Sequence, residues 1–191
     1  HVALLQAKKE MGIEYTWSES VKSADFARIM REYAENGYQL ITGDSFGAER
    51  IARRVARDYP QVSFVFGSGI GPAEPNFGVF DNWIHEPAYL SGMIAGKMTK
   101  SNVLGYVASF PIPEVIRGIN ATFLAARSVN PNVRIKIIWV FTWFDPGKEA
   151  DAAKTLIDQG ADIILQHTDS PAPMQVAEKR GKFAFGQASD M

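Results

Sequence analysis

Apolar positions along the chain follow two spacings, one typical of strands and one typical of helices. Short apolar runs rich in β-branched and aromatic residues occur at Val62–Phe66 and Val103–Ala108, and such runs predict buried strands. Between runs of this kind, apolar residues recur every three or four positions, as in Phe26–Tyr33, which predicts amphipathic helices. Strands that alternate with helices indicate βαβ units, and we therefore expect an α/β fold with parallel sheets.

The predicted elements follow one another along the whole chain. We expect strands at Ile13–Trp17, Tyr38–Thr42, Val62–Phe66, Phe77–Phe80, Val103–Ala108, Arg134–Val140, Ala161–Leu165 and Lys182–Phe185. We expect helices at Val2–Met11, from Ser23 to Asn36, around Ile51–Tyr59, at Glu86–Met98 and Glu114–Val129, from Pro146 to Gly160, and at Pro171–Arg180. The sequence opens within a helical pattern and stops just after a strand, which predicts a fragment of a longer protein.

Two stretches of the chain resemble each other, Asn36–Ser45 and Gln159–Ser170. Each contains a glycine that ends a helix, an apolar strand, and an Asp-Ser pair after the strand. Two similar Rossmann-like lobes would explain the likeness, and so would the general similarity of βαβ units. We expect a first lobe at residues 1–100, lacking its first strand, and an incomplete second lobe at residues 101–191, with the join near Lys97–Asn102.

Composition narrows the classes of function. The chain has 191 residues, of which 46% are hydrophobic, and a net charge of -1. It has no basic stripe, so we expect no nucleic-acid partner. The absence of cysteine excludes disulfides, thiolate zinc sites and cysteine nucleophiles, and with three histidines we expect neither a metal site nor a cofactor. No apolar run approaches the roughly 18 residues that span a membrane.

The strongest functional signal lies in Ile135–Asp151. Its apolar run ends in Trp143 and Phe144, after which Asp145 and Pro146 have the residue types of a helix cap and a first helical residue. In open α/β sheets, ligands bind at the carboxyl ends of strands. We therefore predict that the two aromatic residues belong to a ligand site.

Other strand ends carry further candidate residues. Asp44, Ser45 and Phe46 follow one predicted strand, Asp169 follows another, and Asp190 follows the last. Aromatic residues in such loops either stack on a planar ligand or fill the loop. The carboxylates suit hydroxyl or N–H donors of a ligand, or they cap the next helix.

One short motif predicts a different function. The stretch Gly43–Gly47 fits G-x-S-x-G between a strand and a helix, which is the nucleophile turn of α/β-hydrolases. Ser45 would be the nucleophile, with His85 or His167 as base. However, turns after strands attract Gly, Asp and Ser for conformational reasons alone, so a serine hydrolase is the alternative rather than the first reading.

Several long segments, in order, resemble the basic membrane protein (BMP) family of ABC-transporter substrate-binding lipoproteins. These segments are Gly96–Lys100, Val103–Ala108, Pro111–Asn120, Trp143–Glu149, Gln159–Asp162 and Phe185–Asp190. The resemblance implies a type I periplasmic binding protein fold of two lobes. It also implies a non-enzymatic protein that delivers a purine base or nucleoside to an ABC transporter permease.

The resemblance also assigns roles to residues. It implies that Phe46 and Trp143 sandwich the purine, and that Asp190 is the family's acidic residue. Asp169 stands in a loop that is Gly-Gly in many members, a difference that favours a free base over a nucleoside. The protein would be periplasmic or an outward-facing lipoprotein, attached to the membrane only through a lipid anchor outside this chain. A ligand-sensing core of a transcription regulator, which shares the fold class, is a further alternative.

Overall fold

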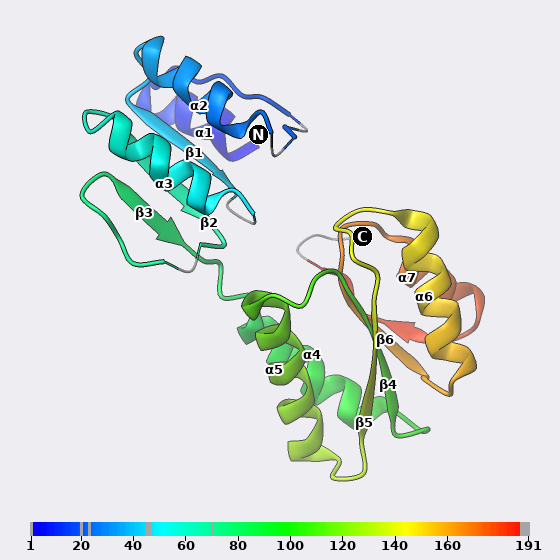
Figure 1. Ribbon diagram of the computed structural model, residues 1–191. Coiled ribbons are helices and arrows are strands. Elements are labelled where there is room, and N and C mark those ends of the chain that lie inside the picture. The colour runs from blue at the N-terminus through cyan, green and yellow to red at the C-terminus, as the bar shows by residue number, and fades with distance from the viewer. Residues whose placement is uncertain (1, 20, 23, 45–46, 70, 188–191) are drawn as a thin grey trace. The chain divides into compact units, whose positions relative to one another are not determined.

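The computed structural model describes residues 2–19, 21–22, 24–44, 47–69 and 71–187 (Figure 1). The chain divides into two compact units, His1–Asn82 and Trp83–Met191. Every strand pairing in both units is parallel, which confirms the predicted α/β class. Each unit is described separately below.

The first unit contains a three-stranded sheet in the order β1-β2-β3. Its elements are α1 (Val2–Met11), α2 (Phe26–Glu35), β1 (Leu40–Asp44), α3 (Glu49–Asp58), β2 (Ser63–Gly67) and β3 (Phe77–Phe80). Alternate strand residues such as Phe64 and Phe66 are buried against Met30 of α2 and Val55 of α3. Because successive strand residues point to opposite faces, these helices cover one face of the sheet.

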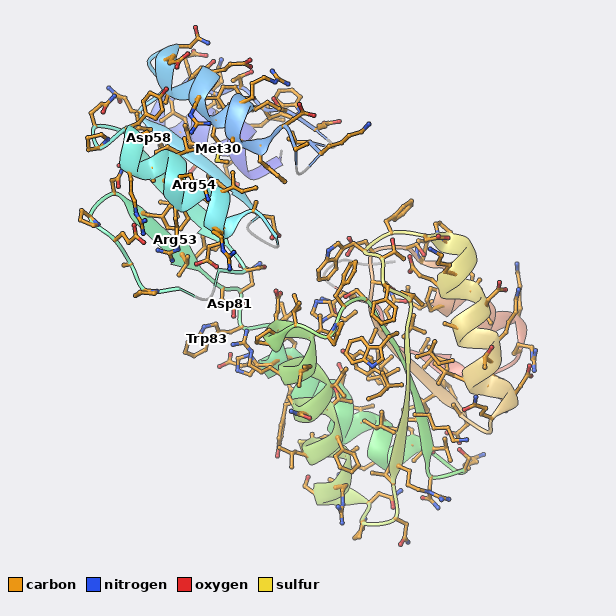
Figure 2. The ribbon with its side chains drawn as sticks, in the orientation of Figure 1. Met30, Arg53, Arg54, Asp58, Asp81 and Trp83 are labelled. Carbon is orange, nitrogen blue, oxygen red and sulfur yellow. The ribbon has the colours of Figure 1, made fainter. Side chains whose placement is uncertain are left out.

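The loop between β2 and β3 is fixed by charged side chains of α3 (Figure 2). Glu49 accepts hydrogen bonds from Arg53 Nε and from the backbone N–H of Gly71, both at 2.9 Å. Arg53 Nη1 also donates to Glu74 Oε1 at 3.0 Å, and its guanidinium lies 4.5 Å from the ring centre of Phe77. This network joins the helix, the loop and the last strand of the sheet.

One predicted strand is wrong. Residues 13–17 form no strand, and the side chains of Ile13 and Trp17 are 37% and 50% exposed. A run of β-forming residues becomes a strand only where a neighbouring strand pairs with it, and here Trp17 instead stacks on Tyr15. The other predicted elements are present with ends shifted by a few residues, and Ser23 lies outside the described residues.

The second unit contains a four-stranded sheet in the order β5-β4-β6-β7. Helices α4 and α5 lie on one face and α6 and α7 on the other (Figure 1). Every residue of the central strands β4 and β6 is buried. The elements are α4 (His85–Met98), β4 (Val103–Ala108), α5 (Pro113–Val129), β5 (Arg134–Trp139), α6 (Pro146–Asp158), β6 (Ile163–His167), α7 (Ala172–Lys179) and β7 (Phe183–Ala184).

Helix α4 packs against α5 with the two backbones in direct contact. A Cβ atom added at Gly92 would collide with the backbone of Thr122, and one at Gly96 would lie 2.6 Å from the carbonyl oxygen of Ala126. These glycines explain why α4 belongs to the second unit. The chain therefore divides after Asn82, before α4, whereas the predicted lobes divide after residue 100.

The amino ends of β4 and β6 are joined through Asp162. Its carboxylate accepts hydrogen bonds from Thr99 Oγ1 at 2.6 Å and from the backbone N–H groups of Lys100 and Ser101 at 2.7 and 3.0 Å. Burial alone would raise the pKa of Asp162, but these hydrogen bonds outweigh it and lower the pKa below its ordinary value. The connection from α4 into β4 is thus fixed to the start of β6.

Candidate ligand-binding site

The carboxyl ends of β4, β5 and β6 meet at one edge of the second sheet. Ala108 of β4 pairs with Trp139 on one side and with His167 on the other. Because all three strands are parallel, the residues that follow them emerge side by side. These residues are Phe110, the stretch 140–145, and the stretch 168–171.

An aromatic cluster occupies this edge. The ring of Trp143 lies 5.4 Å from Phe110 and 6.1 Å from His167, between ring centres, and Phe110 lies 6.4 Å from Phe141. Trp143 is half-buried and packs against the core, while Phe141 and Phe144 are each 63% exposed. The cluster therefore presents aromatic surface at the position where α/β sheets bind ligands.

Phe141 adopts an unusual backbone conformation in this cluster. Its φ is 52°, a value that bulky residues rarely adopt and that costs on the order of 1–3 kcal/mol. The chain after β5 remains hydrogen-bonded to the chain after β4, because Val140 and Phe141 donate to the carbonyl groups of Ala108 and Ser109 at 2.9 and 3.0 Å. This pairing holds Phe141 in the strained conformation, beside Phe110.

His167 is the titratable member of the cluster. It is 6% exposed, and burial lowers its pKa to about 4. A Cβ atom added at Gly118 of α5 would lie 3.8 Å from His167 Nδ1 and 3.5 Å from the Tyr106 hydroxyl, which shows how closely α5 covers both side chains. His167 is consequently neutral at pH 7 and contributes an aromatic ring to the cluster.

The two loops at this edge are linked to each other. The backbone N–H of Asp169 donates to the carbonyl oxygen of Trp143 at 2.9 Å. Asp145 caps α6, as predicted, by accepting from the backbone N–H of Lys148 at 3.1 Å, and this hydrogen bond lowers the pKa of Asp145. The side chain of Asp169 itself is exposed.

Only some of the predicted site residues lie together in the structure. Trp143, Phe144 and Asp169 lie at the same edge of the second sheet, whereas Asp44 is the exposed last residue of β1 in the first unit. Ser45, Phe46 and Asp190 lie outside the described residues, so their roles stay predictions. The cluster also includes Phe110 and Phe141, whose only sequence signal was their position after an apolar run, and His167, which the sequence suggested only as a candidate base of a hydrolase.

A separate cavity of about 230 Å³ lies in the second unit. It is lined by the start of α4, by α5, by β4 and β6, and by residues 185–187, and its polar lining includes Ser91, Tyr106 and Gln166. Of the predicted site residues that the structure describes, none of Asp44, Trp143, Phe144 and Asp169 lines it. Because it is smaller than the roughly 300–1,000 Å³ of common small-molecule pockets, the aromatic edge is the better candidate site.

Two further classes of site find no support in the described residues. No three histidine, aspartate or glutamate side chains there are grouped so that they could hold a metal ion. None of the helices in that part of the chain has the length and apolar character that a membrane crossing requires.

The parallel sheets and their helices define an α/β fold of the type I solute-binding kind. A crystal structure of ABC transporter solute-binding proteins from Aeropyrum pernix K1 matches it with a TM-score of 0.83 at 20% identity, covering 96% of this chain and 55% of that chain. The sequence profile of the PnrA-like ABC transporter substrate-binding proteins, the Bmp family, matches residues 1–191. The chain belongs to this family, which confirms the resemblance seen in the sequence.

Two relatives share much of the sequence. A purine-binding protein of Brucella abortus is 49% identical over 193 residues, covering 97% of this chain and 55% of the relative. A Haloferax volcanii protein whose name assigns it to ABC-transporter glucose binding is 41% identical over 191 residues, covering 97% of this chain and 49% of the relative. The chain spans about half the length of these relatives.

Proposed function

We propose that this protein is the substrate-binding component of an ABC transporter and that its ligand is a purine base or nucleoside. The observation that carries the proposal is the aromatic cluster around Trp143, in a chain that is 49% identical to a purine-binding relative. A planar purine that stacks on one aromatic face gains roughly 1–3 kcal/mol, by analogy with nucleic-acid bases on protein aromatics.

The proposed contacts divide by chemistry. Trp143 and Phe144 supply apolar surface, and Phe46 is the expected second stacking residue. Asp169, exposed in the loop beside that of Trp143, is expected to accept hydrogen bonds from ring N–H groups or ribose hydroxyls, with Asp44, Ser45 and Asp190 as further expected polar contacts. A carboxylate here also disfavours nucleotides, because it would repel a phosphate group.

The partners follow from the transport role. We infer a permease as the protein partner, no nucleic-acid partner, and a location facing outward, either in the periplasm or as a cell-membrane lipoprotein. We assign no catalytic step. Membership of a substrate-binding family favours transport over a hydrolase that uses Ser45 and over a transcription regulator.

A sugar is the second candidate ligand, favoured by the relative named for glucose binding. Aromatic faces and carboxylates also suit sugars, because a carboxylate accepts hydrogen bonds from hydroxyl groups. The two ligand classes therefore have to be separated by direct measurement.

A thermal-shift series on the full-length protein makes this separation. Adenine, guanine, their nucleosides and glucose are each added in excess, and a ligand at 100 times its Kd stabilises the folded state by about 2.7 kcal/mol. We expect the purines to raise Tm and glucose to leave it unchanged. A shift with glucose alone would favour the sugar, and no shift with any purine contradicts the proposal.

Matched variants test the residues. Trp143→Phe should reduce the purine shift and Trp143→Ala should abolish it, because the stacking surface shrinks and then disappears. Phe183→Ala is the control, since Phe183 is a 57% exposed aromatic in the edge strand β7 rather than in the cluster. Ser45→Ala should retain most of the shift, whereas the hydrolase alternative predicts loss of an esterase activity in that variant.

A further inference from the structure

Glu149 is a fully buried acid that no ligand contact accounts for. It lies in the first turn of α6 and is 0% exposed. Burial of a carboxylate is costly unless hydrogen bonds compensate for it. Within the described residues, every hydrogen-bond donor to this carboxylate is an uncharged N–H or O–H group.

The two oxygens of Glu149 hold two different loops. Oε1 accepts from the backbone N–H of Asp145 at 2.9 Å. Oε2 accepts from Ser170 Oγ at 2.7 Å and from the backbone N–H of Ser170 at 3.3 Å. Asp145 follows Trp143 and Phe144 directly, and Ser170 follows Asp169, so one side chain joins the two loops that carry the candidate site.

Other hydrogen bonds also fix the loop that contains Ser170. Gln166 Nε2 donates to the carbonyl oxygens of Thr168 and Ser170, both at 3.1 Å, and Ser170 Oγ accepts from the backbone N–H of Ala172 at 3.3 Å. Ala172 begins α7, so Glu149 lies between the amino ends of α6 and α7. Both helix dipoles favour a negative charge at that place.

We propose that Glu149 is a positioning residue for the ligand site. It makes no contact with the ligand. It fixes the loop of Trp143 against the loop of Asp169, so that the aromatic surface is in place before a ligand arrives. The direct hydrogen bond from Asp169 N–H to the carbonyl oxygen of Trp143, at 2.9 Å, reports whether the two loops are joined. The ligand part of this inference rests on the proposed function, and the structural part does not.

Glu149→Gln is the first test. The substitution keeps the size of the side chain but replaces one acceptor oxygen by an NH₂ group, which then faces the N–H or O–H donors of Asp145 or Ser170. Amide hydrogen exchange measured by NMR should show the Asp169 amide exchanging at least tenfold faster relative to core amides such as that of Val107. Glu178→Gln, an exposed substitution on α7, should leave the Asp169 amide unchanged.

Purine affinity, measured by titration calorimetry on the same full-length variants, is the second readout. We expect the Kd for the purine to rise about tenfold or more in Glu149→Gln. In Ser170→Ala, which removes only the hydroxyl donor, the Kd should rise by a smaller factor. Ser170→Ala also replaces Glu149→Gln as the test variant if Glu149→Gln fails to fold. Unchanged protection of Asp169 in both variants overturns the inference, and so does lost protection with wild-type affinity. If the unmodified protein binds no purine, the proposed function fails, while the exchange experiment still decides whether Glu149 joins the loops.

Discussion

The two units use a glutamate at the start of a helix in different ways. Glu49 of α3 and Glu149 of α6 each follow a parallel strand and each accept a backbone N–H from a loop. Glu49 is partly exposed and pairs with Arg53, whereas Glu149 is fully buried and bonded only to neutral donors. The first unit thus fixes its loop with opposite charges, and the second fixes its loops with uncharged groups.

This difference separates two ways to order a loop. Ion pairs at partly exposed positions are screened by salt and contribute little each. A buried carboxylate bonded to N–H and O–H groups is insensitive to salt, but its removal leaves buried donors without partners. The loops that carry the candidate ligand site are held in the second way, which suits a surface that must keep its shape.

The largest expected effect comes from removing the two carboxylates. Glu149→Ala leaves the donors of Asp145 and Ser170 unsatisfied, and should lower the free energy of unfolding of the second unit by about 4 kcal/mol. Glu49→Ala should cost the first unit about 2 kcal/mol, because Arg53 still pairs with Glu74. Exchange of the slowest amides in β4 and in β2 measures each unit separately. Equal costs in the two units would remove the distinction between them.

A somewhat smaller effect is expected from pH, through His167. Its pKa is about 4 in the folded state and about 6.5 in an unfolded chain, so the unfolded state binds more protons between these values. Stability should therefore fall as the pH drops from about 6.5 to about 4, by up to about 3 kcal/mol, and level off below. Urea unfolding at a series of pH values measures this change.

His167→Gln provides the comparison for that series. The variant should lose the part of the pH dependence that lies between about 4 and 6.5. A pH profile identical to that of the unmodified protein would show that the neutral, buried state of His167 makes no contribution to stability.

The smallest expected effect concerns salt and Arg53. Arg53→Met keeps apolar contact with Phe77 but removes the charge between Glu49 and Glu74, and should cost the first unit about 1–2 kcal/mol. The pKa of Glu74 is lowered, most strongly by the hydrogen bond from Arg57 and further by the one from Arg53, so these charges attract each other in the folded unit.

High salt should lower the free energy of unfolding of the unmodified first unit by about 0.5 kcal/mol. The exchange rates of the slowest amides in β4 should not change. A salt response in the second unit of equal size would contradict the comparison.

Most of the fold could be predicted because its signals are local. Val103–Ala108 is an apolar run that became the central strand β4 with the predicted ends, and Pro146 begins α6 after its Asp145 cap. Ile13–Trp17 failed because a strand needs a partner that the sequence does not show. The position of α4 also depended on a non-local contact, that of Gly92 with Thr122 in α5.

The candidate site also contains residues that the sequence could predict and residues that it could not. Trp143 and Asp169 could each be predicted to follow a strand, but the strand order that brings their loops together came only from the structure. Glu149 could not be recognised, because in the sequence Gly-Lys-Glu-Ala-Asp it resembles an exposed helix residue. Its burial depends on Ser170, and Phe141 joins the cluster only through a strained backbone that the neighbouring strand maintains.

The close approach of α4 and α5 restricts how this protein can change over evolutionary time. At Gly92 and Gly96 there is no room for even a methyl group beside the α5 backbone, so a larger residue at either position forces the helices apart. Because α5 covers His167 and Tyr106 through Gly118, such a shift of α5 would also change the packing around the aromatic cluster. Inherited variation is therefore expected to accumulate elsewhere, and changes in this helix pair to be accepted only together with compensating changes across it.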